Sequence, residues 1–387
     1  MNIKEMDQKY IANTYGRFDL VLTQGKGSVA ADDQGKSYID LGTGIAVNAF
    51  GISDEAWMAA VETQMHQLPH TSNLYYTEPQ VKLAKMLCEK TGMEKVFFGN
   101  SGAEANECAI KVARKYAHDI RKDENPVIVT LKNSFHGRTV TTLAATGQDN
   151  FHQYFGPFTP GFIYVDPDDF SQMEKALSDP HVCAVLMEMV QGEGGIHVLD
   201  QSFVKNTAAL CKEKGVLLMI DEVQTGNGRT GQLYAYMHYD VQPDVVTTAK
   251  GLGGGLPIGA CMMRGEAAQV LQAGHHGSTF GGNPVCAAGA LSIISRLDET
   301  LLAQVREKNA YIVNALIGAP GIKGITGLGL MLGLETVKPA KQVVSLCQEK
   351  GVLVLTAKEK VRLLPALNIP MELLVKAVMI IKEVAAQ

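Results

Sequence analysis

Between residues 95 and 264 the chain alternates short apolar runs with amphipathic stretches of helical period. The apolar runs are rich in β-branched residues and include "VIVTL" (127–131), "VLLMIDE" (216–222) and "VVTTA" (245–249). Nearly continuous apolar strands that alternate with helices are typical of a parallel sheet covered by helices on both faces. The pattern therefore predicts an α/β fold with a mostly parallel central sheet.

Both ends of the chain follow a different pattern. The stretch "SVAADDQGKSYIDLG" (28–42) alternates like an antiparallel hairpin around an Asp-Gln-Gly turn, and the C-terminal part mixes helices with short strands. We therefore predict a large domain with a small α+β domain built from both termini. The expected segments are residues 1–45 (N-terminal part of the small domain), 46–290 (large α/β domain) and 291–387 (C-terminal part of the small domain).

Composition narrows the classes of function. The chain is 46% hydrophobic and 19% charged, as in ordinary globular proteins, and its net charge of -5 without a basic stripe argues against nucleic acid. No apolar run approaches the roughly 20 residues that cross a bilayer, so no membrane partner is expected. Seven scattered cysteines suggest reduced thiols in a cytoplasmic protein. His66 and His70 have no third ligand nearby, so no metal site is expected.

The stretch "VLLMIDEVQTGNGRTG" (216–231) resembles two nucleotide-binding patterns. The ATPase interpretation also needs G-x-x-x-x-G-K-[ST], and the nearest match, "AADDQGKS" (30–37), lacks the first glycine. The dinucleotide interpretation needs its glycines directly after a strand, whereas "DEVQT" intervenes and brings two acidic residues to the expected pyrophosphate. Both are disfavoured, and we expect the glycines to bend the chain back over a site.

A phosphate site without a lysine is predicted at "GNSGAEANECAIKVAR" (99–114). Ser101 and Glu104 have the spacing of a capping box that opens a helix after a strand. The free N–H groups of Gly102 and Ala103 would then face outward at the positive end of the helix dipole, where phosphate binds well.

Two further residues complete a constellation. Lys250 lies between an apolar strand and the glycine run "GLGGG", where burial would lower its amine pKa and make it a nucleophile toward carbonyl groups. Asp221 ends another apolar strand. A cofactor with a phosphate, an aldehyde and a basic ring nitrogen would use all three features, and pyridoxal 5'-phosphate (PLP) is such a molecule.

With "HTSNLYYTEPQ", "SFHGRTVTTLAATGQ", "VQGEGGI" and "GSTFGGNPV", these motifs resemble the class III (subgroup II) PLP-dependent aminotransferases over nearly the whole chain. The resemblance implies the aminotransferase fold type I, a covalent bond between Lys250 and the PLP aldehyde, and Asp221 opposite the ring nitrogen. It implies a homodimer with shared active sites. The other implied cofactor contacts are Phe135 and Val223 on the two ring faces, Gln224 at the ring hydroxyl, Gly102 and Ala103 at the phosphate, and Thr279 at the phosphate from the neighbouring subunit.

The resemblance also implies which residues hold the substrates. Arg138 would hold the carboxylate of an acylated amino donor, because a guanidinium clamps a carboxylate with two hydrogen bonds. Arg362 would hold the α-carboxylate of glutamate and 2-oxoglutarate. Glu193 would cover Arg362 when the first substrate is bound, and Ser278 would contact substrate across the interface. Freed Lys250 would act as general base and acid.

The expected reaction moves the δ-amino group of N2-acetylornithine to 2-oxoglutarate, as in family members of arginine biosynthesis. Alternative donors are succinylornithine, succinyldiaminopimelate, ornithine and GABA, because all of them would use the same cofactor residues. A non-catalytic PLP-fold binding subunit is a further alternative, against which the intact lysine, acids and arginines speak. The chain departs from the family where "ISDEAW" (52–57) replaces a histidine-proline turn and where "EMVQGEGG" lacks a proline, which is expected to affect loops near the entrance.

Overall fold

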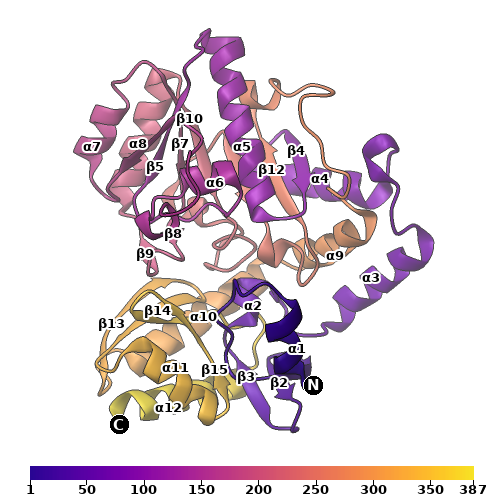
Figure 1. Ribbon diagram of the computed structural model, residues 1–387, viewed down its shortest axis with the longest axis vertical. Coiled ribbons are helices and arrows are strands. Elements are labelled where there is room, and N and C mark those ends of the chain that lie inside the picture. The colour runs from indigo at the N-terminus through magenta and orange to yellow at the C-terminus, as the bar shows by residue number, and fades with distance from the viewer.

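A computed structural model describes residues 1–387 (Figure 1). Its largest sheet has seven strands in the order β4-β12-β11-β10-β7-β5-β6. Only β12 runs antiparallel to its neighbours, which confirms the predicted α/β fold with a mostly parallel sheet. The strands are β4 (Lys95–Gly99), β5 (Val127–Leu131), β6 (Phe162–Val165), β7 (Val182–Met187), β10 (Leu217–Asp221), β11 (Val245–Thr248) and β12 (Gly259–Met263).

Strand β10 shows why its apolar run is nearly continuous. Leu217 and Met219 belong to the core cluster under α5 (Gly102–Tyr116), whereas Leu218 and Ile220 belong to the cluster that contains residues of α8 (Gln201–Lys214). Successive side chains of a strand point to opposite faces, so a sheet covered on both faces needs apolar residues at every position. Burying each such side chain stabilises the fold by about 1.5–3 kcal/mol.

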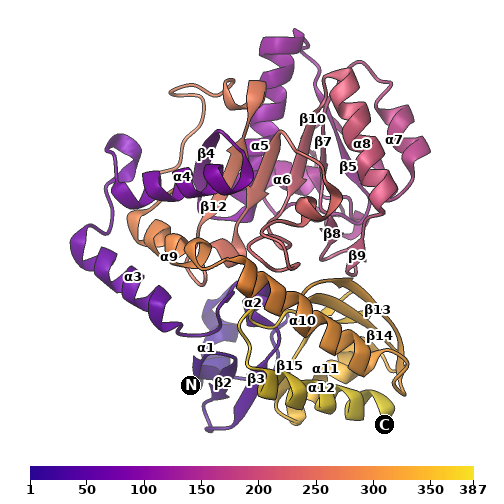
Figure 2. The same cartoon turned by 180° about the vertical axis from the view of Figure 1, so that it is seen from behind.

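The lower part of the molecule in Figures 1 and 2 contains both termini. One sheet has the order β1-β2-β3-β15, and β15 pairs with β3 in parallel, so the two ends of the chain share a sheet. A second sheet has the order β13-β14-β17-β16. The strands are β1 (Leu22–Lys26), β2 (Val29–Asp32), β3 (Ser37–Asp40), β13 (Ile322–Leu328), β14 (Met331–Thr336), β15 (Val352–Leu353), β16 (Leu355–Ala357) and β17 (Lys360–Leu363). The boundaries of the domains stay a prediction.

Helices complete the two parts. The longer ones are α1 (Ile3–Tyr10), α3 (Glu55–Gln67), α4 (Glu78–Thr91), α9 (Pro284–Ser295), α10 (Glu299–Leu316), α11 (Ala340–Glu349) and α12 (Met371–Ala386). The shorter ones are α2 (Thr43–Ala46), α6 (Val140–Ala145), α7 (Phe170–Ala176), η1 (Ser72–Leu74), η2 (Ala117–Arg121), η3 (Asp149–Phe151), η4 (Ala235–Tyr239), η5 (Lys250–Leu252) and η6 (Gly265–Ala268). None of the helices combines the length and the apolar composition needed to cross a bilayer.

The atypical segment 52–57 forms a well-made helix start. Asp54 is the N-cap of α3, since its carboxylate accepts the backbone N–H of Trp57 at 3.0 Å and also pairs with Arg296 at 2.8 Å. The helix packs on α9 and presents the indole of Trp57 to the glycine run, where Nε1 donates to the carbonyl of Gly253 at 2.9 Å. This departure from the family pattern therefore gives the glycine run a side-chain anchor.

The glycines of "GNGRTG" do bend the chain, but away from the expected place. Gly228 and Gly231 have φ of 86° and 85°, and their backbones lie against side chains of α10 and of Leu367. Arg229, buried in this bend, donates to the carbonyls of Leu330 and Pro365. The prediction of a bend over the site was therefore wrong, because the buried arginine bonds the bend to the C-terminal part of the chain.

Candidate active site

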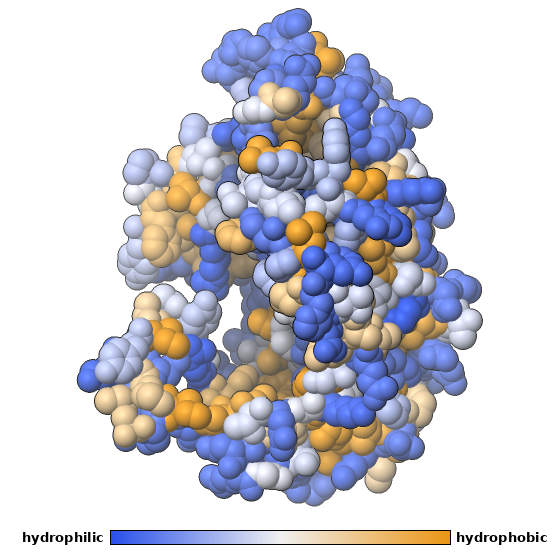
Figure 3. Space-filling model, turned by 90° about the vertical axis from the view of Figure 1, so that its right-hand side faces the viewer, coloured by the Kyte–Doolittle hydropathy of each residue, from blue (hydrophilic) through white to orange (hydrophobic).

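A cavity of about 460 Å³ opens where β10 and β11 end and α5 begins. The carboxyl ends of parallel strands meet at one edge of a sheet, so residues far apart in sequence converge there. Figure 3 shows that the molecule is deeply hollowed between its upper and lower parts. The predicted site residues that line the cavity are Gly102, Ala103, Phe135, Arg138, Asp221, Val223, Gln224 and Lys250.

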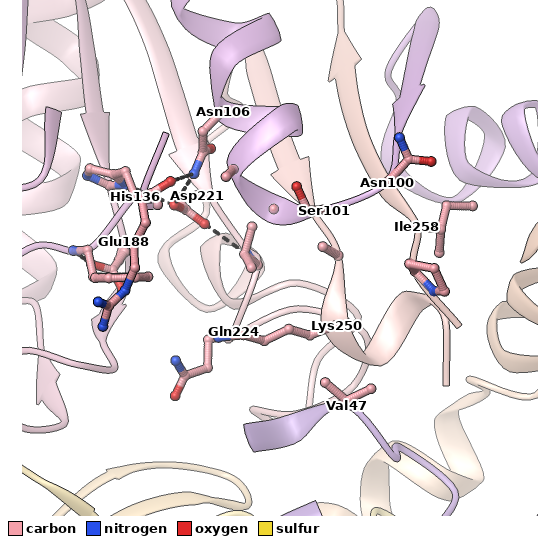
Figure 4. Close-up of a pocket in the computed structure, with 18 of the residues that line it drawn as sticks. Val47, Asn100, Ser101, Asn106, His136, Glu188, Asp221, Gln224, Lys250 and Ile258 are labelled. Atoms are coloured by element: carbon pink, nitrogen blue, oxygen red, sulfur yellow. Dashed lines mark hydrogen bonds and ion pairs between the residues drawn. The ribbon is translucent and has the colours of Figure 1, made fainter. Parts of the chain in front are cut away.

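The carboxylate of Asp221 is held on several sides (Figure 4). Its Oδ2 lies 2.8 Å from Nδ1 of His136 and accepts from Nδ2 of Asn106 at 2.8 Å, while Oδ1 accepts the N–H of Val223 at 2.9 Å. Thr247 fixes the amide of Asn106 by donating to its Oδ1 at 2.7 Å. A buried carboxylate with this many donors stays fixed in orientation, which is what a fixed negative charge in a cavity requires.

A second carboxyl group near Asp221 was not predicted. Glu188 is buried and accepts the N–H of Phe135 at 2.9 Å and the N–H of Gly192 at 3.2 Å. Burial, and then the charge of Asp221, raise the pKa of Glu188 well above its ordinary value. Through these two hydrogen bonds Glu188 fixes the backbone that carries Phe135.

The start of α5 differs in one detail from the predicted capping box. Ser101 is the N-cap and its side chain accepts the N–H of Glu104 at 3.1 Å, as expected. The Glu104 carboxylate, however, accepts from the N–H and the side-chain amide of Asn100, one residue earlier than a capping box requires. The reciprocal bond was therefore wrongly placed, because Asn100 offers two donors to the same carboxylate.

Gly102 lies in the first turn of α5, against Val223. A Cβ on Gly102 would be 2.6 Å from Cγ1 of Val223, so no larger residue fits without moving one of the two elements. The first N–H groups of a helix have no partner within it, and those of Gly102 and Ala103 lie at the cavity wall. This end of the cavity can therefore bind an anionic group.

Lys250 is the amine of the site. No carboxylate lies within 4.0 Å of its Nζ, and burial lowers the pKa of Lys250 below its ordinary value. Its φ of 46° is left-handed, a strained conformation for a residue with a Cβ. An amine with a lowered pKa is more often uncharged at neutral pH, and an uncharged amine can attack a carbonyl carbon.

Hydrogen bonds on both sides of Lys250 hold its left-handed backbone conformation in place. Asn227 of the glycine bend donates to the hydroxyl of Thr248 at 2.9 Å and to the carbonyl of Ala249 at 3.2 Å. On the other side, Trp57 holds the carbonyl of Gly253. These hydrogen bonds hold residues 248–249 directly before the lysine and Gly253 three residues after it.

Glu193 and Arg362 lie beside the cavity rather than in its wall. Glu193 is at the turn between β8 (Val190–Gln191) and β9 (His197–Val198), and its Oε1 accepts from Nη1 of Arg362 on β17 at 2.5 Å. Gln224 joins the pair, accepting from the same Nη1 at 3.1 Å and donating to Glu193 at 3.4 Å. Burial favours the neutral form of Glu193, but Arg362 outweighs it and keeps the pKa of Glu193 below its ordinary value.

Two predicted residues lie away from the cavity wall of this chain. Thr279 is exposed to solvent and does not line the cavity. Ser278 is half-buried, and its hydroxyl accepts from Nδ2 of Asn100, which does line the cavity. Neither residue is brought to the site within one chain.

Residues 10–385 match the family model for class-III aminotransferases. The chain therefore belongs to this family. It is 48% identical to the acetylornithine aminotransferase of Haemophilus ducreyi, over 100% of this chain and 98% of that one, and 44% identical to the enzyme of that name from Methanocaldococcus jannaschii, over 95% and 94%.

Solved structures agree with the fold. The ornithine aminotransferase of Toxoplasma gondii superposes with a TM-score of 0.95 at 34% identity, covering 99% of this chain and 94% of that one. The N-acetylornithine aminotransferase of Stenotrophomonas maltophilia gives a TM-score of 0.85 at 34% identity, covering 99% and 98%. Class III aminotransferases depend on PLP, which another structure of the Toxoplasma enzyme contains at partial occupancy.

The cavity of this chain fits PLP in its chemistry. The wall offers free N–H groups for a phosphate, an amine for an aldehyde, a fixed carboxylate for a basic ring nitrogen, and the aromatic ring of Phe135 for stacking. Gly102 has no room for a Cβ beside Val223, so only a glycine lets the first turn of α5 lie this close to Val223 at the cavity wall. When bound, PLP serves as an acceptor for the electron pair released as a proton leaves the substrate carbon.

Proposed function

We propose that the chain transfers the δ-amino group of N2-acetylornithine to 2-oxoglutarate and forms N-acetylglutamate 5-semialdehyde and glutamate. The observation that carries this proposal is an unpaired lysine and an unpaired arginine, Lys250 and Arg138, in the wall of one cavity with the fixed carboxylate of Asp221. Full-length relatives at 42–48% identity that bear the name acetylornithine aminotransferase support the choice of donor.

The cofactor contacts are proposed residue by residue. Gly102 and Ala103 would hold the phosphate, and Phe135 and Val223 would face the two sides of the ring. Asp221 would stand opposite the ring nitrogen, Gln224 at the ring hydroxyl, and Lys250 would carry the aldehyde carbon. All seven of these residues line the cavity, which supports the assignment.

Lys250 performs the proton transfers in the proposed reaction. With PLP bound, the amine of Lys250 would act as the base that takes the proton from the δ-carbon of the donor, and it would hold that proton at Nζ for return. Burial lowers the pKa of Lys250, which favours this exchange, because a group takes and returns protons best when its pKa lies near the working pH.

The two arginines divide the substrates between them. Arg138 is exposed at the cavity and has no acidic partner, so it is available to the α-carboxylate of N2-acetylornithine. Arg362 is neutralised by Glu193, so only a substrate with a carboxylate at that position gains by displacing Glu193. 2-Oxoglutarate has such a carboxylate, whereas the δ-amine end of N2-acetylornithine has none.

A homodimer is part of the proposal. Large hydrophobic side chains are exposed next to Ser278 and Thr279, which indicates an interaction surface. Asn73 donates to the carbonyl of Ser278 at 2.9 Å and so joins the two exposed segments. A second copy docking here would bring the Ser278–Thr279 segment to its active site. The exposed side chains are Leu74, Tyr75, Tyr76 and Phe280.

A cytoplasmic setting is also proposed for the enzyme. All seven cysteines are free and six of them are buried. Free thiols are what a reducing compartment preserves.

A substrate panel tests the proposed activity. We expect kcat/KM to be highest for N2-acetylornithine among N2-acetylornithine, succinylornithine, succinyldiaminopimelate, ornithine and GABA. Arg138→Ala should lower kcat/KM for N2-acetylornithine by about 100-fold, because a bidentate guanidinium–carboxylate pair contributes roughly 3 kcal/mol. Arg138→Lys keeps the positive charge but cannot form the bidentate pair. Its kcat/KM for N2-acetylornithine should therefore lie between the values of the parent enzyme and of Arg138→Ala.

Two results would contradict the proposal. A higher kcat/KM for ornithine or GABA would assign the chain to another ω-aminotransferase activity. Failure of glutamate to convert the bound PLP to its amine form would instead favour a non-catalytic binding subunit.

A further inference from the structure

Arg138 is oriented by aromatic rings instead of by an acid. Its guanidinium carbon lies 4.8 Å from the ring centroid of Phe151 and 5.9 Å from that of Phe135. The two rings meet edge to face, with centroids 5.8 Å apart and planes at 63°. Arg138 makes no ion pair within 4.0 Å. The two phenylalanines therefore form a shelf on which the charged group rests.

This arrangement leaves the arginine free to bind a ligand. A guanidinium above a ring is attracted by the π-electrons and keeps its five N–H donors available. A carboxylate partner would use two of those donors and would have to be displaced by the substrate, as Glu193 must be displaced from Arg362. Holding Arg138 by rings orients the group without introducing a competitor.

The shelf itself is firmly placed. Phe151 ends the short helical turn η3, and its N–H donates to the carbonyl of Gln148 at 3.0 Å. Gln148 is buried and donates from its side chain to the carbonyl of Ser134 at 3.0 Å, next to Phe135. The backbone of Phe151 is thus joined through Gln148 to the segment that carries Arg138.

We infer that Phe151 is a positioning residue that sets the preference of the enzyme for amino donors with a carboxylate. The inference rests on the proposed role of Arg138 as the group that binds this carboxylate. Phe151 is expected to act on donor affinity and on no other property, because it contacts Arg138 and does not line the cavity.

The experiment uses the PLP-loaded enzyme and a matched pair of donors. N2-Acetylornithine and N-acetylputrescine carry the same acetamide and the same primary amine, and differ only in the carboxylate. The half-reaction with donor alone, followed by the absorbance of PLP, gives an apparent Kd and a limiting rate for each. The variants are Phe151→Leu, Phe151→Tyr, Arg138→Ala, and Phe155→Leu as the control in an exposed position of the same loop.

We expect Phe151→Leu to raise the apparent Kd for N2-acetylornithine about fivefold to tenfold, the range for loss of a partly exposed cation–π contact. The limiting rate and the apparent Kd for N-acetylputrescine should stay unchanged. Phe151→Tyr retains an aromatic ring, so its apparent Kd for N2-acetylornithine should equal that of the parent enzyme. Phe155→Leu should have no effect on this apparent Kd. In an Arg138→Ala background, Phe151→Leu should add nothing.

The outcomes separate this inference from the proposed function. If Arg138→Ala weakens N2-acetylornithine selectively but Phe151→Leu does not, the inference about Phe151 is wrong and the role of Arg138 stands. If Phe151→Leu weakens both donors equally, Phe151 only supports the fold of the loop and the inference is again wrong. If Arg138→Ala leaves the apparent Kd of both donors unchanged, the proposed carboxylate site itself is wrong.

Discussion

Replacing Glu193 by glutamine should strengthen the binding of 2-oxoglutarate. Glu193 bonds Arg362 through Oε1 and Nη1 at 2.5 Å, in a place where Arg362 is only 4% exposed. A substrate carboxylate that binds Arg362 must first displace this carboxylate. Because the pKa of Glu193 is held below its ordinary value, Glu193 is ionised at neutral pH and competes throughout the working range.

The size of the effect follows from what glutamine keeps. Two unit charges about 4 Å apart attract by about 4 kcal/mol at an effective dielectric constant of 20, which is an upper limit here. Glutamine can still accept a hydrogen bond from Arg362, and a neutral bond contributes about 1 kcal/mol against roughly 1.5–3 for a charged one. The difference of about 1.4 kcal/mol corresponds to a tenfold change in affinity.

Steady-state kinetics with both substrates measures this change. For Glu193→Gln we expect KM for 2-oxoglutarate to fall about tenfold, while the apparent Kd for N2-acetylornithine in the half-reaction stays within about twofold, since that donor places no carboxylate at Arg362. Glu335→Gln, which neutralises an exposed partner of Lys360, serves as the control. An unchanged or higher KM for 2-oxoglutarate would show that Glu193 does not compete with substrate for Arg362.

Further predictions concern the lysine, a buried acid and the glycine run. Lys250→Ala should abolish multiple turnovers and the covalent retention of PLP seen by mass spectrometry, and surviving turnover would refute its role. Burial raises the pKa of Glu222 to about 7, so its contribution to stability is complete below pH 4.5 and is lost as pH rises to about 7. In urea unfolding the parent should lose about 3 kcal/mol more over this interval than Glu222→Gln, and parallel curves would contradict this. Trp57→Phe should lower stability by about 1 kcal/mol and speed amide hydrogen exchange in residues 251–256, whereas unchanged exchange would remove Trp57 as their anchor.

Much of the central sheet could be predicted because its strands are buried on both faces. An apolar run such as "VLLMI" has few other places in a globular fold, and β10 follows it closely. The direction of a strand could not be predicted in the same way, since the run "ACMMR" (260–264) gives no sign that β12 runs antiparallel to its neighbours. Strand β13, "IKGITGL", was not expected, because its glycines weaken the pattern and pairing with β14 compensates for them.

The site could be predicted where function coincides with the end of an element. Asp221, Lys250 and Gly102 each lie at the end of a strand or the start of a helix, which is where an α/β sheet binds ligands. Asn106 and Glu188 were missed because their role is to position other residues of the site. Asn106 donates to Asp221, and Glu188 accepts the N–H of Phe135. The available signal was a polar residue on the buried face of α5 and an acid within the apolar run "CAVLMEMV".

Trp57 is the only tryptophan of the chain, and it lies against the turn that follows Lys250. The intrinsic fluorescence of the protein therefore comes mainly from a single position beside the site. Energy transfer from this indole to a bound chromophore, and quenching when the turn shifts, would report cofactor loading and donor binding without any label. The natural sequence thus contains its own optical probe for titrations of the site.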